Sequence, residues 1–309
     1  MGNPNRVAIL GVFVADTAYR ADRQPRMGET ILGNSFRLGP GGKGSNQAVA
    51  AARLGADVSF ITRLGDDAFA DMALKTWADA GVTPAVIRDP ASYTGAAYIF
   101  IDERTGDNAI IISPGAAATI APADLDAHAG LIAAASVFVT QLEQPLDAAV
   151  RGLEIARDNG VTTILNPAPG RELPDDVLKL CDYLTPNETE AEELTGIPVA
   201  DDAAARAAAE QLRARGVGTV VMTLGARGAL LHGHGHSAVV PALSAGPVVE
   251  TTGAGDAFNG GLATALSRGT DPFEAVRFAC ATAAISVTRP GTAPSMPALA
   301  EVEALLARG

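Results

Sequence analysis

The stretch 250-ETTGAGDAFNGG-261 sets Gly253, Ala254 and Gly255 directly before Asp256, and a run of helical character follows. Small residues ahead of a helix let backbone N–H groups approach a ligand closely, and the helix dipole adds partial positive charge there. The stretch therefore predicts an anion hole for a phosphoryl group in transfer, with Asp256 beside it to accept a proton from an attacking hydroxyl. An ordinary glycine turn, in which Asp256 only stabilises the helix N-terminus, explains these letters equally well.

The composition around this stretch is that of a globular enzyme. The chain has 309 residues, of which 48% are hydrophobic and 19% charged, enough for one large α/β domain or two modest ones. A net charge of −12 argues against nucleic acid or an anionic membrane surface as the main partner, because both bind basic patches. Cys181 and Cys280 lack a pairing or metal-type spacing, and the apolar run 7-VAILGVFV-14 is too short for a signal peptide or a membrane span. We therefore expect a cytoplasmic protein.

Apolar runs of strand length alternate with stretches of helical spacing along most of the chain. The expected strands are 7–14, 57–65, 136–143, 161–169 and 218–225. The expected helices are 45–55, 67–81, 145–160, 201–216, 254–268, 272–287 and 297–308. Continuous apolar strands separated by helices predict an α/β fold whose parallel sheet is covered on both faces.

Two other segments alternate in polarity: 28-GETILGNSFRLGP-40 and 93-YTGAAYIFIDERTGDNAIIIS-113, the second with a hairpin-like turn at 103-ERTGDN-108. Alternation predicts antiparallel strands with one covered face, set apart from the main sheet. A small exposed sheet is unstable alone, so we expect it to cover a substrate, a partner subunit or both. Its exposed edges favour a homodimer.

A second glycine-rich cluster, 39-GPGGKGSNQAVAAARLG-55, contains the pattern G-x-G-x-x-G. That pattern supports a dinucleotide-binding dehydrogenase only weakly, and the strand before it alternates where a dinucleotide fold has a buried run. The P-loop pattern fails as well, because Gly44 follows Lys43 where Ser or Thr is required. We interpret the cluster as a turn that brings the Gly42 N–H, Lys43 and Asn46 onto a polyhydroxylated ligand.

With both clusters in view, the sequence resembles the ribokinase family of carbohydrate kinases over nearly its whole length. The N-terminal signature is 41-GGKGSNQAVAAARLG-55, and the C-terminal one is 250-ETTGAGDAFNGG-261. Shorter matches are 141-QLE-143, 165-LNPAP-169, 185-TPNETEAEELTG-196, 223-TLGARG-228 and 287-VTRPGTAPS-295. The resemblance implies one doubly wound α/β kinase domain over residues 1–309, with lid strands from about 12–40 and 92–113 that are often shared across a dimer. It also implies ATP-dependent phosphorylation of the primary hydroxyl of a sugar.

The resemblance also assigns roles to positions. Asp256 matches the catalytic base, and Gly253, Ala254 and Gly255 match the anion hole. The positions that match sugar contacts are Val14, Asp16, Gly42, Lys43, Asn46, Glu143 and Asp256. The positions that match ATP contacts are Asn187, Thr223, Gly225, Gly228, Gly255 and Cys280. Glu190 matches a residue near the Mg²⁺–phosphate cluster, and because Mg²⁺ neutralises phosphate charge, the acidic net balance is no obstacle.

The family further uses a monovalent cation, usually K⁺, beside the anion hole. The matching positions are Glu250, Thr252, Ser286, Arg289, Gly291 and Ser295. Several of them would contribute backbone carbonyls, so their side chains matter little. Glu250 departs from the family, where Asp is common, but it keeps the charge with one more methylene. The resemblance therefore implies activation by K⁺.

The stretch 11-GVFVAD-16 is the more telling departure, because the family usually reads Gly-Ser-x-Asn-x-Asp there. Val14 replaces the Asn that reaches the sugar near its 2-hydroxyl, and the loss of that hydrogen bond would cost about 1–3 kcal/mol. 2-Deoxyribose would lose nothing, and the related deoxyribokinases carry an apolar residue at this position. An apolar pocket rejects an extra hydroxyl only weakly. We therefore expect ribose as the main substrate, with Asp16 holding its 2-hydroxyl, and keep 2-deoxyribose as the alternative.

Three further interpretations concern other chemistry. A kinase for another sugar remains possible within the family, and a sugar-sensing pseudokinase is the alternative from a different class. Asp256 and the pair in NETE argue against a pseudokinase, because such proteins lose these residues. The run 232-HGHGH-236 would set three histidines on one strand face, but its glycines favour an exposed hairpin turn over a metal site. Trp77 lies in a helical pattern and is expected in the core.

Overall fold

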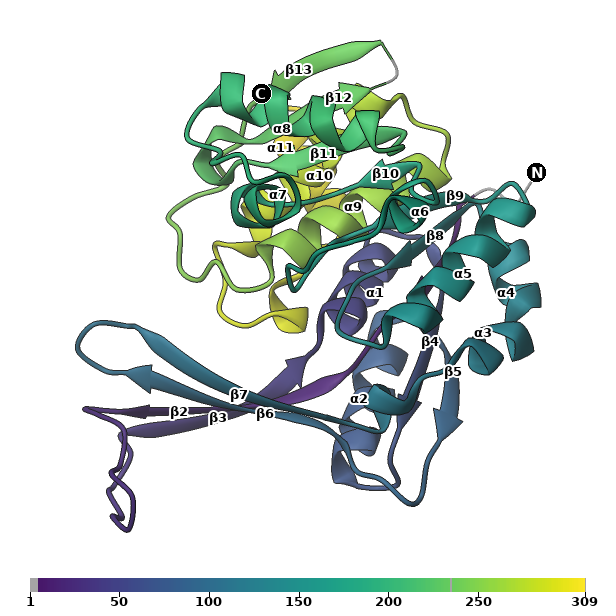
Figure 1. Ribbon diagram of the computed structural model, residues 1–309. Coiled ribbons are helices and arrows are strands. Elements are labelled where there is room, and N and C mark those ends of the chain that lie inside the picture. Colours follow the sequence, from purple (N-terminus) through teal and green to yellow (C-terminus); the bar gives the residue numbers. More distant parts are fainter. Residues whose placement is uncertain (1–4, 234, 309) are drawn as a thin grey trace.

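The computed structural model describes residues 5–233 and 235–308, which form two sheets of different character. A nine-stranded sheet lies between layers of helices, and a four-stranded sheet, the lid, projects away from it (Figure 1). Within the described residues no helix is both long and apolar enough to cross a membrane.

The main sheet has the order β13-β12-β11-β10-β9-β8-β1-β4-β5. Its strands are β1 (Arg6–Leu10), β4 (Asp57–Leu64), β5 (Thr83–Arg88), β8 (Val137–Thr140), β9 (Thr162–Leu165), β10 (Tyr183–Leu184), β11 (Thr219–Thr223), β12 (Ala229–Gly233) and β13 (His236–Val240). Neighbouring strands pair in parallel from β11 to β5, and β12 and β13 add an antiparallel hairpin at one edge. The predicted mostly parallel, doubly wound sheet is confirmed.

Helices cover both faces of this sheet. One layer holds α1 (Lys43–Arg53), α2 (Ala68–Ala80), α9 (Ala254–Ser267) and α10 (Pro272–Ser286), with α11 (Leu299–Leu306) packed on α10. The other layer holds α3 (Pro122–Ala127), α4 (Ala129–Ala133), α5 (Leu146–Asp158), α6 (Asp175–Leu178), α7 (Glu188–Thr195) and α8 (Asp202–Ala214). Short 3-10 helices lie at η1 (Ala116–Thr119), η2 (Gly225–Arg227) and η3 (Ala293–Ser295).

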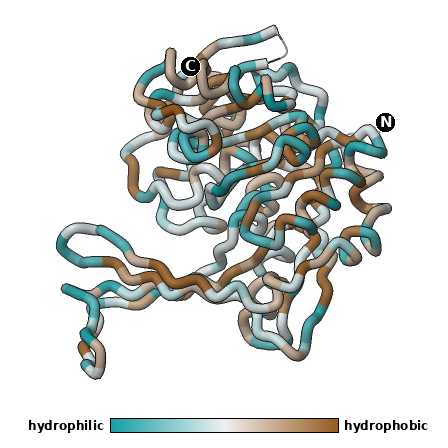
Figure 2. The backbone as a smooth tube through the Cα atoms, viewed as in Figure 1, coloured by the Kyte–Doolittle hydropathy of each residue, from teal (hydrophilic) through white to brown (hydrophobic). Residues whose placement is uncertain are grey.

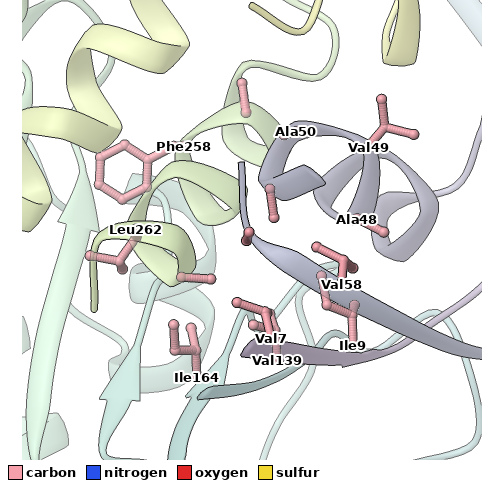
Figure 3. Packing of buried hydrophobic residues seen from close by; sticks show 14 of the residues in the cluster. Val7, Ile9, Ala48, Val49, Ala50, Val58, Val139, Ile164, Phe258 and Leu262 are labelled. Carbon is pink, nitrogen blue, oxygen red and sulfur yellow. The ribbon is translucent and has the colours of Figure 1, made fainter. Parts of the chain in front are cut away.

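Alternate residues of the central strand β1 serve the two layers. Val7 and Ile9 belong to the core cluster that also holds Phe258 of α9 (Figure 3), whereas Leu10 clusters with Leu153 of α5. All three β1 side chains are fully buried. Burying a Val, Leu or Ile side chain stabilises a fold by about 1.5–3 kcal/mol. A strand that is apolar at every position is therefore the expected sequence for a sheet buried on both faces.

The lid sheet has the order β3-β2-β6-β7. Its strands are β2 (Val14–Ala21), β3 (Ser35–Gly41), β6 (Thr94–Asp102) and β7 (Asn108–Gly115). The pairs β2–β3 and β6–β7 are antiparallel, as predicted, but the central pair β2–β6 is parallel, so the expectation of antiparallel strands is wrong there. After β3 the chain builds α1, β4, α2 and β5 before it returns, and β6 then leaves the main body in the same direction as β2.

Two further expectations are corrected, one at the base of the lid and one at its far end. The expected strand 7–14 is two strands, because β1 ends at Leu10 in the main sheet and β2 begins at Val14 in the lid. Residues 28–34 are not a strand. The Glu29 carboxylate accepts hydrogen bonds from the Arg23 guanidinium (2.5 and 2.7 Å) and the Arg26 N–H (2.9 Å), which closes a turn.

The far end of the lid confirms the predicted hairpin turn and exposes apolar side chains. The Asp102 N–H donates to the Asp107 carbonyl at 2.8 Å, where β6 turns into β7. Ile110, Ile111 and Ile112 of β7 are 51%, 66% and 55% exposed. Figure 2 shows this apolar stretch along the projecting sheet. Consecutive residues of a strand point to opposite faces, so neither face of the lid is fully covered.

Candidate active site

The glycine-rich stretch forms the N-terminus of α9. Gly253 precedes the helix with φ 82°, in the left-handed region that favours glycine. A side-chain carbon added at Gly255 would meet no heavy atom within 4 Å, so the space in front of this turn is open. The Ala254 N–H donates to the Thr251 carbonyl at 3.1 Å and is therefore engaged. The N–H groups of Gly255 and Asp256 follow it at the helix N-terminus, a position suited to an anion.

Asp256 lies in the first turn of α9 and is 7% exposed. Its two carboxylate oxygens accept hydrogen bonds from neighbouring residues of α1: Oδ2 from Asn46 Nδ2 at 2.9 Å and Oδ1 from Gln47 Nε2 at 3.2 Å. Burial raises the pKa of Asp256, while the Lys43 charge and these two hydrogen bonds hold it down. The result is a buried carboxylate of raised basicity beside the anion site, as a general base for a hydroxyl requires.

The start of α1 brings the expected sugar residues together. Gly42 precedes α1 with φ 89°, and a side-chain carbon there would lie 2.5 Å from the Val12 carbonyl, so glycine is required. The Lys43 N–H donates to Glu143 Oε2 at 2.8 Å. Asn46 Oδ1 is buried and has no hydrogen-bond partner in the part of the chain that the structure describes. An acceptor in that state matches the hydroxyl donor of a ligand.

The two carboxylates on the sugar side ionise near neutral pH. Burial raises the pKa of Asp16 to about 6, against the opposing charge of Arg37. Burial likewise raises the pKa of Glu143 to about 7, against the charge and the backbone hydrogen bond of Lys43. Two carboxylates beside an ammonium group offer both acceptors and donors to a polyhydroxylated ligand.

Val14 lies beside these polar groups. It begins β2 two residues before Asp16, so the two side chains lie on the same face of the lid. Val14 is 3% exposed and belongs to the same apolar cluster as Val12 and Ala97. The position where the family usually carries an asparagine is therefore a buried, apolar one.

The residues expected at the nucleotide lie where β10 and β11 end. Asn187 and Glu190 form a capping box at the start of α7: Asn187 Oδ1 accepts from the Glu190 N–H at 2.8 Å, and Glu190 Oε2 accepts from the Asn187 N–H at 2.9 Å. Asn187 also forms a parallel bridge with Thr223. Gly225 begins the η2 turn after β11 with φ 55°, and Gly228 follows the turn with φ 102°.

Cys280 lies on α10 and is 7% exposed. Burial raises the pKa of its thiol to about 12. At neutral pH the side chain is therefore a neutral thiol and not a nucleophile.

The loops expected at a monovalent cation meet beside the start of α9. Glu250 Oε2 accepts from the Gly291 N–H at 2.9 Å, and the Glu250 N–H donates to the Val287 carbonyl at 3.2 Å. The Ser286 and Ser295 hydroxyls donate to carbonyls of their own segments, at 2.9 and 2.7 Å. With these side chains engaged, a cation here would be held by backbone carbonyls and water. Thr252 is exposed, and Arg289 pairs with Glu301.

The donor set for Mg²⁺ is sparse. Among the described residues no group of three or more His, Cys, Asp or Glu side chains could hold a metal ion. Mg²⁺ usually keeps several waters and is bound through substrate phosphates and one or two carboxylates. Glu190 fits that role, because it is a buried carboxylate whose pKa, raised mainly by burial, also responds to the charges of Lys43 and Asp256.

The model of the pfkB family of carbohydrate kinases matches residues 5–299 of this chain. The chain belongs to that family. It is 39% identical over 292 residues to the ribokinase of Haemophilus influenzae, covering 94% of this chain and 95% of the relative. It is 37% identical over 295 residues to the deoxyribokinase of Salmonella typhi, covering 95% and 96%. The ribokinase of Arabidopsis thaliana complexed with ribose and ATP superposes with a TM-score of 0.94 at 32% identity, over 99% of each chain.

This pfkB kinase holds site residues that the sequence analysis did not assign. Gln47 contacts the Asp256 carboxylate, and Gln141 Nε2 donates to Gln47 Oε1 at 2.6 Å. Arg37 of the lid lies 3.5 Å from the Glu250 carboxylate, 213 residues away along the chain. The two glutamines stand inside the signatures GGKGSNQ and QLE, so position within a signature was the available signal. Nothing in the alternation of β3 marks Arg37.

Trp77 and the histidine run 232–236 lie away from the candidate site. Trp77 is fully buried, and its Nε1 donates to Ser45 Oγ at 2.9 Å, so the expected core position is confirmed. The histidine run straddles the β12–β13 hairpin. His232 bonds to Ser237 and Glu210 at 2.9 and 2.8 Å, and His234 lies outside the described residues.

Proposed function

We propose that this carbohydrate kinase transfers the γ-phosphoryl group of ATP to the primary 5-hydroxyl of a pentose, with D-ribose as the main substrate. The observation that carries the proposal is the buried Asp256 in the first turn of α9, whose carboxylate accepts a hydrogen bond from Asn46 at 2.9 Å. One carboxylate thus joins a residue expected at the sugar to the helix N-terminus expected at the phosphate. The ribokinase solved with ribose and ATP, which matches 99% of this chain, supports both substrates.

In the proposed reaction the 5-hydroxyl oxygen attacks the γ-phosphorus, the bond between that phosphorus and the β–γ bridging oxygen breaks, and ADP leaves. Asp256 accepts the hydroxyl proton during the attack. The Gly255 and Asp256 N–H groups at the N-terminus of α9, together with the helix dipole, stabilise the phosphoryl oxygens, since the Ala254 N–H is engaged by the Thr251 carbonyl. Lid closure excludes water and so suppresses hydrolysis of ATP.

The remaining expected residues are assigned by their neighbourhood. We assign the sugar to Asp16, Gly42, Lys43, Asn46 and Glu143, beside Val14 and Asp256. We assign ATP to Asn187, Thr223, Gly225, Gly228 and Cys280. Mg²⁺ neutralises phosphate charge when it is bound with ATP, and Glu190 would hold it through water. The loops that Glu250 and Gly291 join would hold K⁺.

A second substrate, 2-deoxyribose, is favoured by one specific observation. Val14 is buried on the sugar side of the lid and has no hydrogen-bonding group, so the pocket loses nothing when the 2-hydroxyl is absent. The similarity to the deoxyribokinase of Salmonella typhi supports it. Asp16 remains as an acceptor for a 2-hydroxyl, which is why ribose stays the first choice.

The proposal extends to the whole protein. Residues 1–309 form one kinase domain, with β2, β3, β6 and β7 as its lid and a homodimer formed through that lid. The free, buried Cys181 and Cys280 support a reducing, cytoplasmic setting.

The first experiment is ADP release by the purified protein with ATP and Mg²⁺, with and without K⁺, comparing kcat/KM for ribose and 2-deoxyribose. We expect turnover of ribose, and we expect Asp256→Asn to lower kcat by about 10²–10⁴-fold at unchanged sugar affinity. If neither sugar is turned over, the pentose assignment is wrong. Sugar binding without ADP release would identify a sugar-sensing pseudokinase. Near wild-type turnover by the variant would refute the base assignment.

A further inference from the structure

Three buried side-chain amides form a connected chain behind Asp256. Gln47 Nε2 donates to Asp256 Oδ1 and to Asn166 Oδ1, both at 3.2 Å. Gln141 Nε2 donates to Gln47 Oε1 at 2.6 Å, and Asn166 Nδ2 donates to the Thr185 carbonyl at 3.0 Å. Gln47 and Gln141 are fully buried, and Asn166 is 7% exposed. The chain links α1 with the ends of β8, β9 and β10.

The Thr185 backbone carbonyl, at one end of this row of amides, determines which group donates in every hydrogen bond of the row. The Thr185 backbone carbonyl can only accept, so Asn166 must turn its NH₂ toward Thr185 and its oxygen toward Gln47. Gln47 must then turn its NH₂ toward Asn166, which also directs that NH₂ at Asp256. Its own oxygen is left facing the NH₂ of Gln141. Reversing any one amide would set two acceptors or two donors against each other.

Gln141, at the far end of this hydrogen-bonded row of amides, shows that packing alone does not explain why these side chains are amides. Gln141 Oε1 is buried without a hydrogen-bond partner among the described residues. Side-chain carbons added at Gly11 and Gly44 would lie 2.5 and 2.9 Å from it, so the glutamine is tightly enclosed. A buried acceptor without a partner is unfavourable, and an apolar side chain of the same shape would fill the space without that cost. The hydrogen bond that the Gln141 side chain donates to Gln47 is what an apolar side chain could not replace.

We propose that Gln47, oriented by Gln141 and Asn166, is a positioning residue that aims the Asp256 carboxylate at the sugar hydroxyl and keeps it ionised. Asn46 holds the opposite oxygen at 2.9 Å, so the two donors together fix the rotation of the carboxylate. The inference rests on the proposed role of Asp256 as the base. It assigns no contact between Gln47 and the substrates.

In a variant that lacks the Gln47 amide, the pH dependence of kcat/KM also reflects the charged groups around Asp256. These are Lys43 of α1, Asp16 of β2, Glu143 after β8 and Glu190 of α7. Among the described residues, the hydrogen bonds of the Gln47 side chain go to Asn166, Asp256 and Gln141 and to none of these four groups. Loss of a hydrogen bond that favours the ionised carboxylate raises the pKa of Asp256, so the acidic limb of kcat/KM moves to higher pH.

The test is Gln47→Met, which keeps the length of the side chain and removes the amide. We expect kcat to fall by about 10- to 100-fold, a part of the roughly 10²–10⁴-fold that a positioned base supplies. We expect sugar KM to change little and the acidic limb to move up in pH. The matched control is Gln144→Met, since the buried Gln144 amide bonds to Thr140 Oγ1 and the Gln141 carbonyl, at 2.8 and 2.6 Å, and not to Asp256. Gln144→Met should lower the free energy of unfolding without changing kcat or the pH of the acidic limb of kcat/KM.

The outcomes separate this inference from the proposed function. If Gln47→Met folds and matches Gln144→Met in kcat and in its pH profile, while Asp256→Asn is inactive, the positioning role is overturned and the base stands. If Asp256→Asn keeps its turnover, the proposed base itself fails. Should Gln47→Met not fold, Asn166→Leu removes the group that orients Gln47. It must then shift kcat and the acidic limb in the same direction, or the inference is wrong.

Discussion

We expect Asp16 and Glu143, the proposed sugar contacts, to make sugar binding depend on pH near neutrality. Burial raises the pKa of Asp16 to about 6 and that of Glu143 to about 7. Both values lie above those of the unfolded chain, so protonation of these two groups favours the folded state. Their contribution to the free energy of unfolding therefore falls as pH rises from about 4 to about 7. Sugar binding runs the opposite way, because an ionised carboxylate accepts hydroxyl hydrogen bonds better than a neutral one.

Arg37 sets where that change occurs for Asp16. Its charge lowers the pKa of Asp16, against burial. In Arg37→Met we expect that pKa to rise, so the increase of sugar KM on acidification should begin at higher pH. Arg20→Met, which removes an exposed arginine elsewhere on β2, is the matched control. Steady-state KM for ribose measured across pH 5–9 checks this, and identical profiles for the two variants would contradict it.

We expect Val14 to influence the choice between ribose and 2-deoxyribose. Val14→Asn supplies a hydrogen-bonding group on the face that carries Asp16, and we expect the ratio of kcat/KM for ribose over 2-deoxyribose to rise. A hydrogen bond of about 1–3 kcal/mol corresponds to roughly 5- to 150-fold in that ratio. Val14→Ala removes bulk without adding a polar group and should leave the ratio nearly unchanged. An unaltered ratio in Val14→Asn would show that the 2-hydroxyl lies elsewhere.

At the scale of elements, one carboxylate ties helix α2 to the lid. Asp67 caps α2 by accepting from the Ala70 N–H at 2.9 Å, and its second oxygen accepts from the Thr94 N–H at the start of β6, at 2.8 Å. Asp201 caps α8 in the same way, from the Ala204 N–H at 2.8 Å, far from the lid. The two caps therefore form a matched pair.

We expect Asp201→Ala to lower the free energy of unfolding by about 1 kcal/mol, the usual cost of losing an N-cap. Asp67→Ala should lose more and should also raise sugar KM, because the base of β6 loses its anchor at Thr94. Urea unfolding and steady-state kinetics measure both effects. Equal sugar KM in the two variants would show that the Asp67–Thr94 bond does not hold the lid in its working position.

The elements also show what the sequence could predict. Strand β8 is apolar at three of its four positions and is followed by the amphipathic helix α5, so local pattern was enough there. The two-residue strand β10 and the half-exposed edge strand β5 carry no comparable pattern. The parallel pairing of β2 with β6 depends on the path of the chain between them. Alternation within a strand says nothing about the direction of its partner.

For the candidate site too, local sequence pattern predicted some contacts and missed those that depend on long-range packing. Asn46 of the N-terminal signature donates to Asp256 of the C-terminal signature at 2.9 Å, so the structure brings these two signatures together. The amide chain was not predicted, because Gln141 and Gln47 are 94 residues apart and Gln47 and Asp256 are 209 apart. Such a pairing follows from how β8, α1 and α9 pack, and no local spacing encodes it.

At the scale of the whole molecule, the lid exposes apolar side chains that a second protein surface could bury. Strand register sets Ala18, Ile99 and Ile110 in one row across the sheet, on the face that carries Asp16. Ile111 belongs to the opposite face. A second copy of the lid laid over the Asp16 face would bury exposed isoleucines and exclude water from the sugar at the same time. Because burial of the isoleucines and exclusion of water both favour association, we expect the proposed homodimer to form through this face.

We therefore expect the wild-type protein to sediment as a dimer and Ile110→Lys to sediment as a monomer with a raised sugar KM. A lysine in a packed sheet-to-sheet interface leaves a buried, unpaired charge, which is strongly unfavourable. Ile111→Lys adds the same charge on the opposite face and should remain a dimer. Sedimentation velocity on the three proteins distinguishes the faces. A monomeric wild type at working concentration would rule out the dimer, and dissociation by Ile111→Lys alone would move the interface to the other face.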